Sequence, residues 1–378
     1  MSANIKYHSV VAENDKESGF QEFDTVDFVL TGEGRKLAKN SILLSYDLQV
    51  NSTAGTPKAV TDQIRYNHKI GGHSFFESFQ VSNPSGVVEN LQSYPIFCNQ
   101  IASATLSQND YYSLDLLAEG RGPIPENAEI GCERVASDSF TATGAAAISF
   151  SDSQQCIRPL IALNRMSGQD YSFDKNGPVR ISMNLARIVA ALSGGDNSAN
   201  SEYKLVNLRL RFKSVPDDGA KGAMMMLSYG HIKQTINSNS ANISARIPAK
   251  AVTGVSVSFL KQADESSFQA DSYALNKFPN LEEVRFLFSD NLSNNISYSM
   301  EEPNDMMKRG LKALGSAGHD QVQYSKLLAN DGFIIGQDFS QTVDISQNKF
   351  TTQIKSSHTQ GSPYVAHCFF HNILSMSN

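Results

Sequence analysis

The 378-residue sequence has no tryptophan and only four cysteines. Sugar-binding grooves often expose tryptophan, so its absence weakens a lectin interpretation. The cysteines are Cys98, Cys132, Cys156 and Cys368, and no two of them form a Cys-x-x-Cys pair. Four cysteines are too few for a disulfide scaffold in a chain of this length. We expect them to be reduced and mostly buried, as small apolar residues.

Charged residues and long apolar runs are also scarce. Charged residues make up 19% of the chain and the net charge is −6, so there is no general basic field for nucleic acid. No run approaches the ~18 apolar residues of a membrane-spanning helix. Residues 1–9 lack the apolar core of a signal peptide. These features predict a chain made and folded in the cytoplasm.

The familiar catalytic motifs are missing as well. There is no Gly-x-Ser-x-Gly, Walker loop or His-Glu-x-x-His sequence. Gly32 and Gly34 begin a Gly-x-Gly pattern, but the third glycine of a dinucleotide site is absent, so we predict a turn. Paired carboxylates are typical of solvated turns, although the sequence leaves open a glycosidase-like pair about 5–10 Å apart in a cleft. These pairs are Asp24 and Asp27, Asp217 and Asp218, Glu282 and Glu283, and Glu301 and Glu302.

Two histidine clusters are candidate metal sites. His68, His73 and Glu77 resemble the His-x-His and glutamate set of a cupin, but four residues and the Gly71-Gly72 bend separate the histidines. His367 and His371 lie in a predicted strand, where four residues span ~13 Å, too far for one ion. We therefore predict no catalytic, cofactor-binding or metal-binding residue. A tandem jelly-roll carbohydrate-binding or cupin-type metal-dependent protein remains the alternative.

What the sequence does contain is a repeated alternation of apolar and polar residues. In Ser41–Asn51 the residues Ile42, Leu44, Tyr46, Leu48 and Val50 share one face, and polar residues occupy most of the other. A period of two predicts a half-buried strand. The same pattern recurs along the chain. We predict further strands at Phe23–Thr31, Ala145–Ser151, Gln155–Leu163, Pro178–Ala186, Tyr203–Lys213, Met224–Ile236, Asn242–Ile247, Gly254–Leu260, Leu281–Ser289, Asn295–Met300, Phe339–Ser346, Phe350–Ile354 and Pro363–Leu374.

Helical signals are few and the strand pattern appears twice. Ile96–Leu106 predicts one short helix. Residues 301–318 interrupt the strands with a short basic segment, Met306–Leu314, and this insertion is either an exposed helix or loop, or a contact in an assembly. Many short strands separated by turn signals indicate an all-β protein of sandwiches or jelly rolls. We predict an N-terminal arm at 1–19, domains at 20–215 and 224–378, and a linker at 216–223, where proline, glycine and charge follow a strong strand.

Three segments carry a resemblance to a known family. They are Gly71–Pro95, with two predicted strands joined at a Gly-Gly bend and a following hairpin; Phe173–Ala186; and Leu327–Ser346, which leads to Phe350–Lys355 and a closing Pro363-Tyr364 strand. In this order they resemble the double jelly-roll major capsid proteins of icosahedral double-stranded DNA viruses, in the lineage of tailless bacterial viruses and adenovirus.

The resemblance implies two consecutive eight-stranded jelly-roll barrels with short helices in the connecting loops. It further implies a structural, non-enzymatic protein without cofactors, which forms a pseudo-hexameric homotrimer that tiles the shell of a virion. The implied partners are other copies of the chain, neighbouring capsomers, penton and minor capsid proteins, and an internal membrane beneath the shell, with no sequence-specific nucleic-acid contact. The arm at 1–19 is then either a flexible tail or a segment ordered against a neighbouring subunit.

Overall fold

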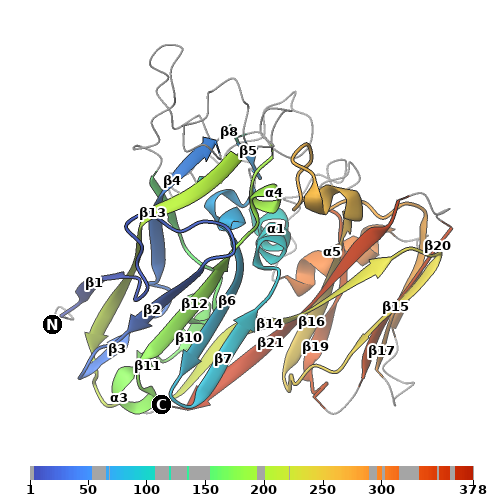
Figure 1. Cartoon of the computed structure of the whole chain (residues 1–378). Coiled ribbons are helices and arrows are strands. Elements are labelled where there is room, and N and C mark those ends of the chain that lie inside the picture. Colours follow the sequence, from blue (N-terminus) through green and yellow to red (C-terminus); the bar gives the residue numbers. More distant parts are fainter. Residues whose placement is uncertain are drawn as a thin grey trace.

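Two β-sandwiches stand side by side in the computed structural model of this chain (Figure 1). The structure describes residues 4–52, 65–67, 69–106, 119–120, 134–135, 154–193, 201–220, 222–288, 296–299, 303–314, 332–346, 349–357 and 362–377. The predicted strand at Ala145–Ser151 lies outside these residues, as do His68, Cys132, Glu301 and Glu302. No helix of the described residues is long and apolar enough to cross a membrane.

The first sandwich consists of a six-stranded and a four-stranded sheet. The six-stranded sheet contains, in order, β11 (Tyr171–Ser172), β3 (Arg35–Leu37), β13 (Ser201–Pro216), β4 (Leu43–Ser52) and β9 (Gln154–Ile157), with β1 (Lys6–Val11) also paired to β13. The four-stranded sheet contains β2 (Thr25–Leu30), β12 (Val179–Leu185), β6 (Phe76–Asn83) and β7 (Gly86–Leu91). All of these ladders are antiparallel.

The apolar side chains of the alternating segments form the core of this sandwich, as predicted. On β4, Leu44, Tyr46, Leu48 and Val50 are at most 1% exposed. β12 alternates in the same way, with every apolar side chain inward. Since successive side chains of a strand point to opposite faces, each strand fills the space between the sheets and leaves a polar outer face.

The second sandwich has a five-stranded and a four-stranded sheet. The first contains β10 (Met166–Gly168), β14 (Ala223–Ile236), β21 (Tyr364–Ser377), β16 (Val252–Lys261) and β19 (Ile334–Val343). The second contains β15 (Ser240–Ala245), β20 (Phe350–Ser356), β17 (Leu281–Phe288) and β18 (Ile296–Ser299). A separate two-stranded ladder joins β5 (Arg65–Tyr66) to β8 (Arg134–Val135).

The two sandwiches share strands and core residues. β14 pairs with β21 without interruption from Ala223↔Ser377 to Ile236↔Tyr364, and β10, which comes from the first half of the chain, pairs with the start of β14. Met224 and Met226 near that start belong to the first core, whereas Ile236 at the other end belongs to the second. One long ribbon therefore contributes to both cores, which makes the packing between the sandwiches continuous.

The predicted all-β pattern of jelly-roll strands is confirmed, and the described sheets of each unit are not closed into a barrel. Within the residues described, no ladder joins the edges of the two sheets in either sandwich, so each unit is an open pair of sheets.

Short helices occupy connections between strands. They are α1 (Tyr94–Thr105), α3 (Phe173–Asn176), α4 (Ile188–Ala191), α5 (Pro303–Ala313) and the 3₁₀ turns η2 (Gly71–Phe75), η5 (Ala162–Asn164) and η7 (Gln262–Ser266). The Gly71-Gly72 bend was predicted to join two strands, and η2 instead precedes β6. A Cβ on Gly72 would lie 2.5 Å from the Tyr46 hydroxyl, which donates a hydrogen bond of 2.7 Å to the Gly72 carbonyl. Glycine permits this close approach.

Candidate functional site at the junction of the two sandwiches

Helix α1 lies between the two sandwiches (Figure 1). It follows β7 directly, begins after Ser93, which has a left-handed φ of 51°, and has proline in its first turn, a position that needs no backbone N–H donor. Ten of its twelve residues are buried, including the polar Asn99 and Gln100. A helix that is buried on nearly all sides packs against protein on each of them, so α1 is the central element of the junction.

Aromatic side chains fill one flank of this helix. The ring of Phe97 on α1 lies 3.8 Å from that of Tyr229 on β14 and 5.5 Å from that of Phe369 on β21, measured between centroids. The guanidinium of Arg165 lies 5.1 Å from the centre of the Phe97 ring. Since Phe97, Tyr229 and Phe369 are each at most 3% exposed, this cluster buries apolar surface of both sandwiches together.

Polar side chains of α1 bind the five-stranded sheet of the second sandwich. The Gln100 amide donates to the Ser258 hydroxyl at 2.8 Å and its oxygen accepts from the Ser256 hydroxyl at 2.6 Å. The Asn99 amide donates to the Tyr273 carbonyl at 2.7 Å. Buried polar groups need such partners, so these bonds fix the position of the helix on the sheet.

Two opposite charges are buried in the same region. Glu89 on β7 accepts a hydrogen bond of 2.6 Å from the Ala162 backbone N–H. Burial raises the pKa of the Glu89 carboxyl to about 7, although Arg165 acts in the opposite direction. Burial likewise lowers the pKa of Arg165, and Glu89 opposes that change. Removal of either side chain would leave the other as an uncompensated buried charge, which would destabilise the junction.

The connection between the sandwiches is held by ionic contacts. Asp217 and Asp218, predicted to lie in a solvated turn, both bind the ammonium of Lys36, which is 3% exposed on β3. Asp217 also accepts a hydrogen bond of 2.5 Å from Ser172, which is the main reason that the pKa of Asp217 is lowered. The segment between β13 and β14 is therefore attached to the first sandwich.

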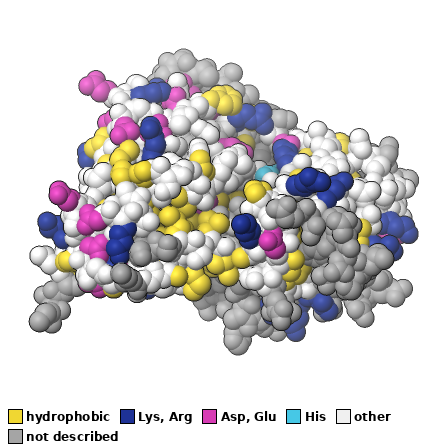
Figure 2. All heavy atoms as spheres, turned by 90° about the horizontal axis from the view of Figure 1, so that it is seen from below, with side chains coloured by type: hydrophobic (Ala, Val, Ile, Leu, Met, Phe, Trp, Pro, Cys, Tyr) yellow, Lys and Arg dark blue, Asp and Glu magenta, His cyan; other side chains and the backbone are white. Residues whose placement is uncertain are grey.

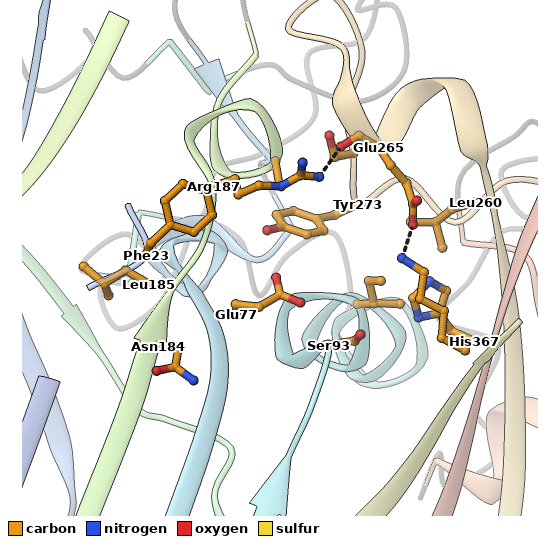
Figure 3. Close-up of a pocket in the computed structure, with 14 residues that line it drawn as sticks. Phe23, Glu77, Ser93, Asn184, Leu185, Arg187, Leu260, Glu265, Tyr273 and His367 are labelled. Carbon is orange, nitrogen blue, oxygen red and sulfur yellow. Dashed lines mark hydrogen bonds and ion pairs between the residues drawn. The ribbon is translucent and has the colours of Figure 1, made fainter. Parts of the chain in front are cut away.

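A pocket of about 430 Å³ opens beside α1, with walls from both sandwiches (Figure 3). The first sandwich and its helices contribute Phe23, Glu77, Ser93, Ile96, Asn184, Leu185, Arg187 and Ala190. The second contributes Lys233, Leu260, Glu265, Ser272, Tyr273 and His367. Six of these fourteen residues are apolar or aromatic, four are charged and four are polar and uncharged, so the pocket combines apolar walls with several polar groups.

Glu77 faces this pocket and has an unusual environment. It reaches solvent through the pocket, but protein surrounds it on the other sides, and this burial raises the pKa of its carboxyl to about 7. Lys233 and Arg187 lower the pKa of Glu77, whereas Glu265 raises it. The Lys233 ammonium already pairs with Glu265 at 2.7 Å.

The structure separates the residues of the cupin-like cluster that it describes. His73 lies in η2, fully buried, with its Nδ1 at 2.7 Å from the Tyr94 hydroxyl and its Nε2 at 3.5 Å from Glu119. Glu77 instead lines the pocket, and His73 does not. Across the described ranges, no group of three or more His, Cys, Asp or Glu side chains is placed to hold a metal ion.

The two histidines of the closing strand have different neighbours. Nδ1 of His367 lies 2.9 Å from Nε2 of His231 on β14, and Nε2 of His371 lies 2.9 Å from the Ser256 hydroxyl. Burial lowers the pKa of His231 to about 4 and that of His371 to about 3. Sequence reasoning missed His231, since only the register of β14 with β21 brings it beside His367.

Comparison with solved structures supports the fold across almost the whole chain. The Faustovirus major capsid protein superposes with a TM-score of 0.62 at 9% identity, over 99% of this chain and 90% of that one. VP54 of PBCV-1, fitted into a reconstruction of the virophage Sputnik, gives 0.61 at 8% identity, over 100% and 97%. A structure of the Sputnik virophage gives 0.58 at 8% identity, over 99% and 88%.

Sequence comparison finds no relative. No family model matches the chain, and no curated protein matches it. At 8–9% identity the shared feature is the path of the chain and the packing of its sheets. This chain has the double jelly-roll fold found in major capsid proteins of double-stranded DNA viruses.

Proposed function

We propose that this protein is a structural capsid protein that assembles as a homotrimer. Each trimer would place six jelly rolls in a pseudo-hexameric capsomer, and capsomers would tile an icosahedral shell in the virion. The observation that carries the proposal is the pair of sandwiches fused through one shared ribbon and α1, matched over 99–100% of this chain by viral capsid proteins.

The junction supports this role because it makes the two sandwiches one unit. A subunit that contributes two of six positions must hold them at a fixed angle. The aromatic cluster around Phe97 and the hydrogen bonds of Gln100 provide that rigidity. In this role the chain performs no catalytic step. The free energy of assembly comes from surface buried between the subunits. We expect obligate contacts above roughly 2,000 Å² within the trimer.

Exposed apolar side chains offer surface for such contacts. Tyr7 and Val11 on β1 are 74% and 40% exposed, and Met225 and Leu227 on β14 are 46% and 49% exposed. Figure 2 shows apolar side chains gathered along the middle of the lower face. Apolar patches on a soluble protein mark interaction surfaces when they are contiguous. In the assembled shell, other copies of the chain and minor capsid or penton proteins are the partners that would cover them, and an internal membrane is the layer expected beneath.

Electron microscopy of the purified protein tests the proposal. Negatively stained fields should show uniform particles with three-fold symmetry and a six-lobed outline. Particles no larger than a single pair of sandwiches, at concentrations where capsid proteins assemble, would contradict it.

A further inference from the structure

The pocket between the sandwiches contains two opposite charges that the fold itself does not pair. Within the described part of the chain, Glu77 forms no hydrogen bond or ion pair. Arg187 donates only to the backbone carbonyl of Glu265, at 3.3 Å. The other two charges, Lys233 and Glu265, neutralise one another at 2.7 Å. The pocket therefore presents one open carboxylate and one open guanidinium.

An aromatic ring lies near these two charges. Figure 3 shows the Tyr273 ring in the same part of the pocket as Arg187 and Glu77. The hydroxyl of Tyr273 is already used, since it donates to the Ser74 carbonyl at 3.3 Å. What Tyr273 offers the pocket is the ring itself, which attracts a cation placed near its face.

Apolar side chains complete the walls. Ile96, Leu185 and Leu260 line the pocket together with Phe23, which is 68% exposed at a left-handed φ of 65°. A cavity of about 430 Å³ falls within the range that accommodates a small organic molecule.

We propose that this pocket binds a small zwitterion that carries an ammonium, a carboxylate and an apolar body, as an apolar amino acid does. The ammonium pairs with Glu77 against the Tyr273 ring, and the carboxylate pairs with Arg187. Charge-assisted hydrogen bonds of this kind are stronger than neutral ones, and a carboxylate matches the planar guanidinium. The apolar body occupies the space beside Leu185 and Leu260.

Such a ligand would touch both sandwiches at once. Glu77 and Arg187 belong to the first sandwich, and Leu260 and Tyr273 to the second. A molecule that binds only the folded junction stabilises it by mass action. The pocket lies within one chain, so binding is measurable whether or not the protein assembles.

Isothermal titration of the full-length protein with three matched probes tests the proposal. L-phenylalanine carries both charges, 2-phenylethylamine only the cation and 3-phenylpropionate only the anion. We expect L-phenylalanine to bind saturably and roughly tenfold or more tightly than either single-charge probe, the loss expected for one missing charge-assisted contact. Equal binding of all three, or no saturable L-phenylalanine binding by about 10 mM, would overturn the proposal.

Two variants locate the site. Glu77→Gln keeps the side-chain shape while removing the charge, and Arg187→Gln removes the guanidinium; each should weaken L-phenylalanine binding roughly tenfold or more. Glu282→Gln, on the outer sheet of the second sandwich and paired with Lys355, is the matched control and should bind as the native protein does. Native affinity in either pocket variant refutes the assignment, and the probe comparison on the native protein remains decisive if a variant fails to fold.

Discussion

Removal of the Phe97 side chain should uncouple the two sandwiches. Phe97 is fully buried on α1 and contacts Tyr229 and Phe369 from the other sandwich. Phe97→Ala therefore leaves a cavity in the aromatic cluster that joins helix α1 to the second sandwich. We expect a loss of stability and, because the bridge is weakened, separate unfolding of the two sandwiches.

The expected size of this loss follows from burial. A buried phenylalanine removes roughly 150–250 Å² from water. At about 25 cal/mol per Å² this corresponds to about 4–6 kcal/mol, an upper bound because the unfolded chain also buries some surface. Phenylalanine-to-alanine changes in cores cost about 3–5 kcal/mol, a large part of a typical total stability of roughly 5–15 kcal/mol.

Differential scanning calorimetry measures both effects. The native protein should unfold in one main transition and Phe97→Ala in two. Phe286→Ala is the matched control, because Phe286 is equally buried but lies in the second core, away from α1. The control should lose comparable stability without gaining a transition between the sandwiches. A loss below about 1 kcal/mol for Phe97→Ala would refute the reasoning, since it is far below the cost of about 3–5 kcal/mol expected for a buried phenylalanine.

Three further predictions concern other parts of the chain. Burial lowers the pKa of His371 to about 3, so its contribution to stability is present above pH ~6.5 and is lost as the pH falls toward 3. In urea unfolding, His371→Gln should lose less stability than the native protein over this pH range. An equal loss in both proteins would count against this role. Gly310→Ala should destabilise the protein in thermal melts despite the better helix propensity of alanine, because the new Cβ would lie 2.8 Å from the backbone of β19; a higher Tm would contradict the packing. Replacing Met225 and Leu227 together by serine should leave Tm within a few degrees but reduce association measured by light scattering, and unchanged association would exclude this face as a contact.

Local strand positions could be predicted from the sequence because they depend on side-chain alternation. β12, β13 and β14 occur within three residues of their predicted bounds, and helix α1 begins two residues before the predicted Ile96–Leu106 segment and ends one residue before its end. The basic segment Met306–Leu314 lies mostly in helix α5, in agreement with the predicted helix or loop at this place. These segments could be predicted because each buries one face, and the spacing of its apolar residues in the sequence shows which face that is.

The junction could not be predicted in the same way. Its contacts join residues far apart in sequence, as in Gln100 with Ser258 and His231 with His367. The pairing of β10 with β14 also crosses the predicted boundary between domains. The sequence suggests Glu77 only as a metal ligand, because its place in a pocket lined also by Arg187 depends on the packing of the two sandwiches around α1. The division into domains at residues 216–223 stays a prediction.

Sedimentation equilibrium of the purified protein tests the assembly claim most directly. The chain has a mass of 41.3 kDa, and the account predicts a species of three times that mass that persists on dilution to low micromolar concentration. A single species of 41.3 kDa at tens of micromolar would contradict it.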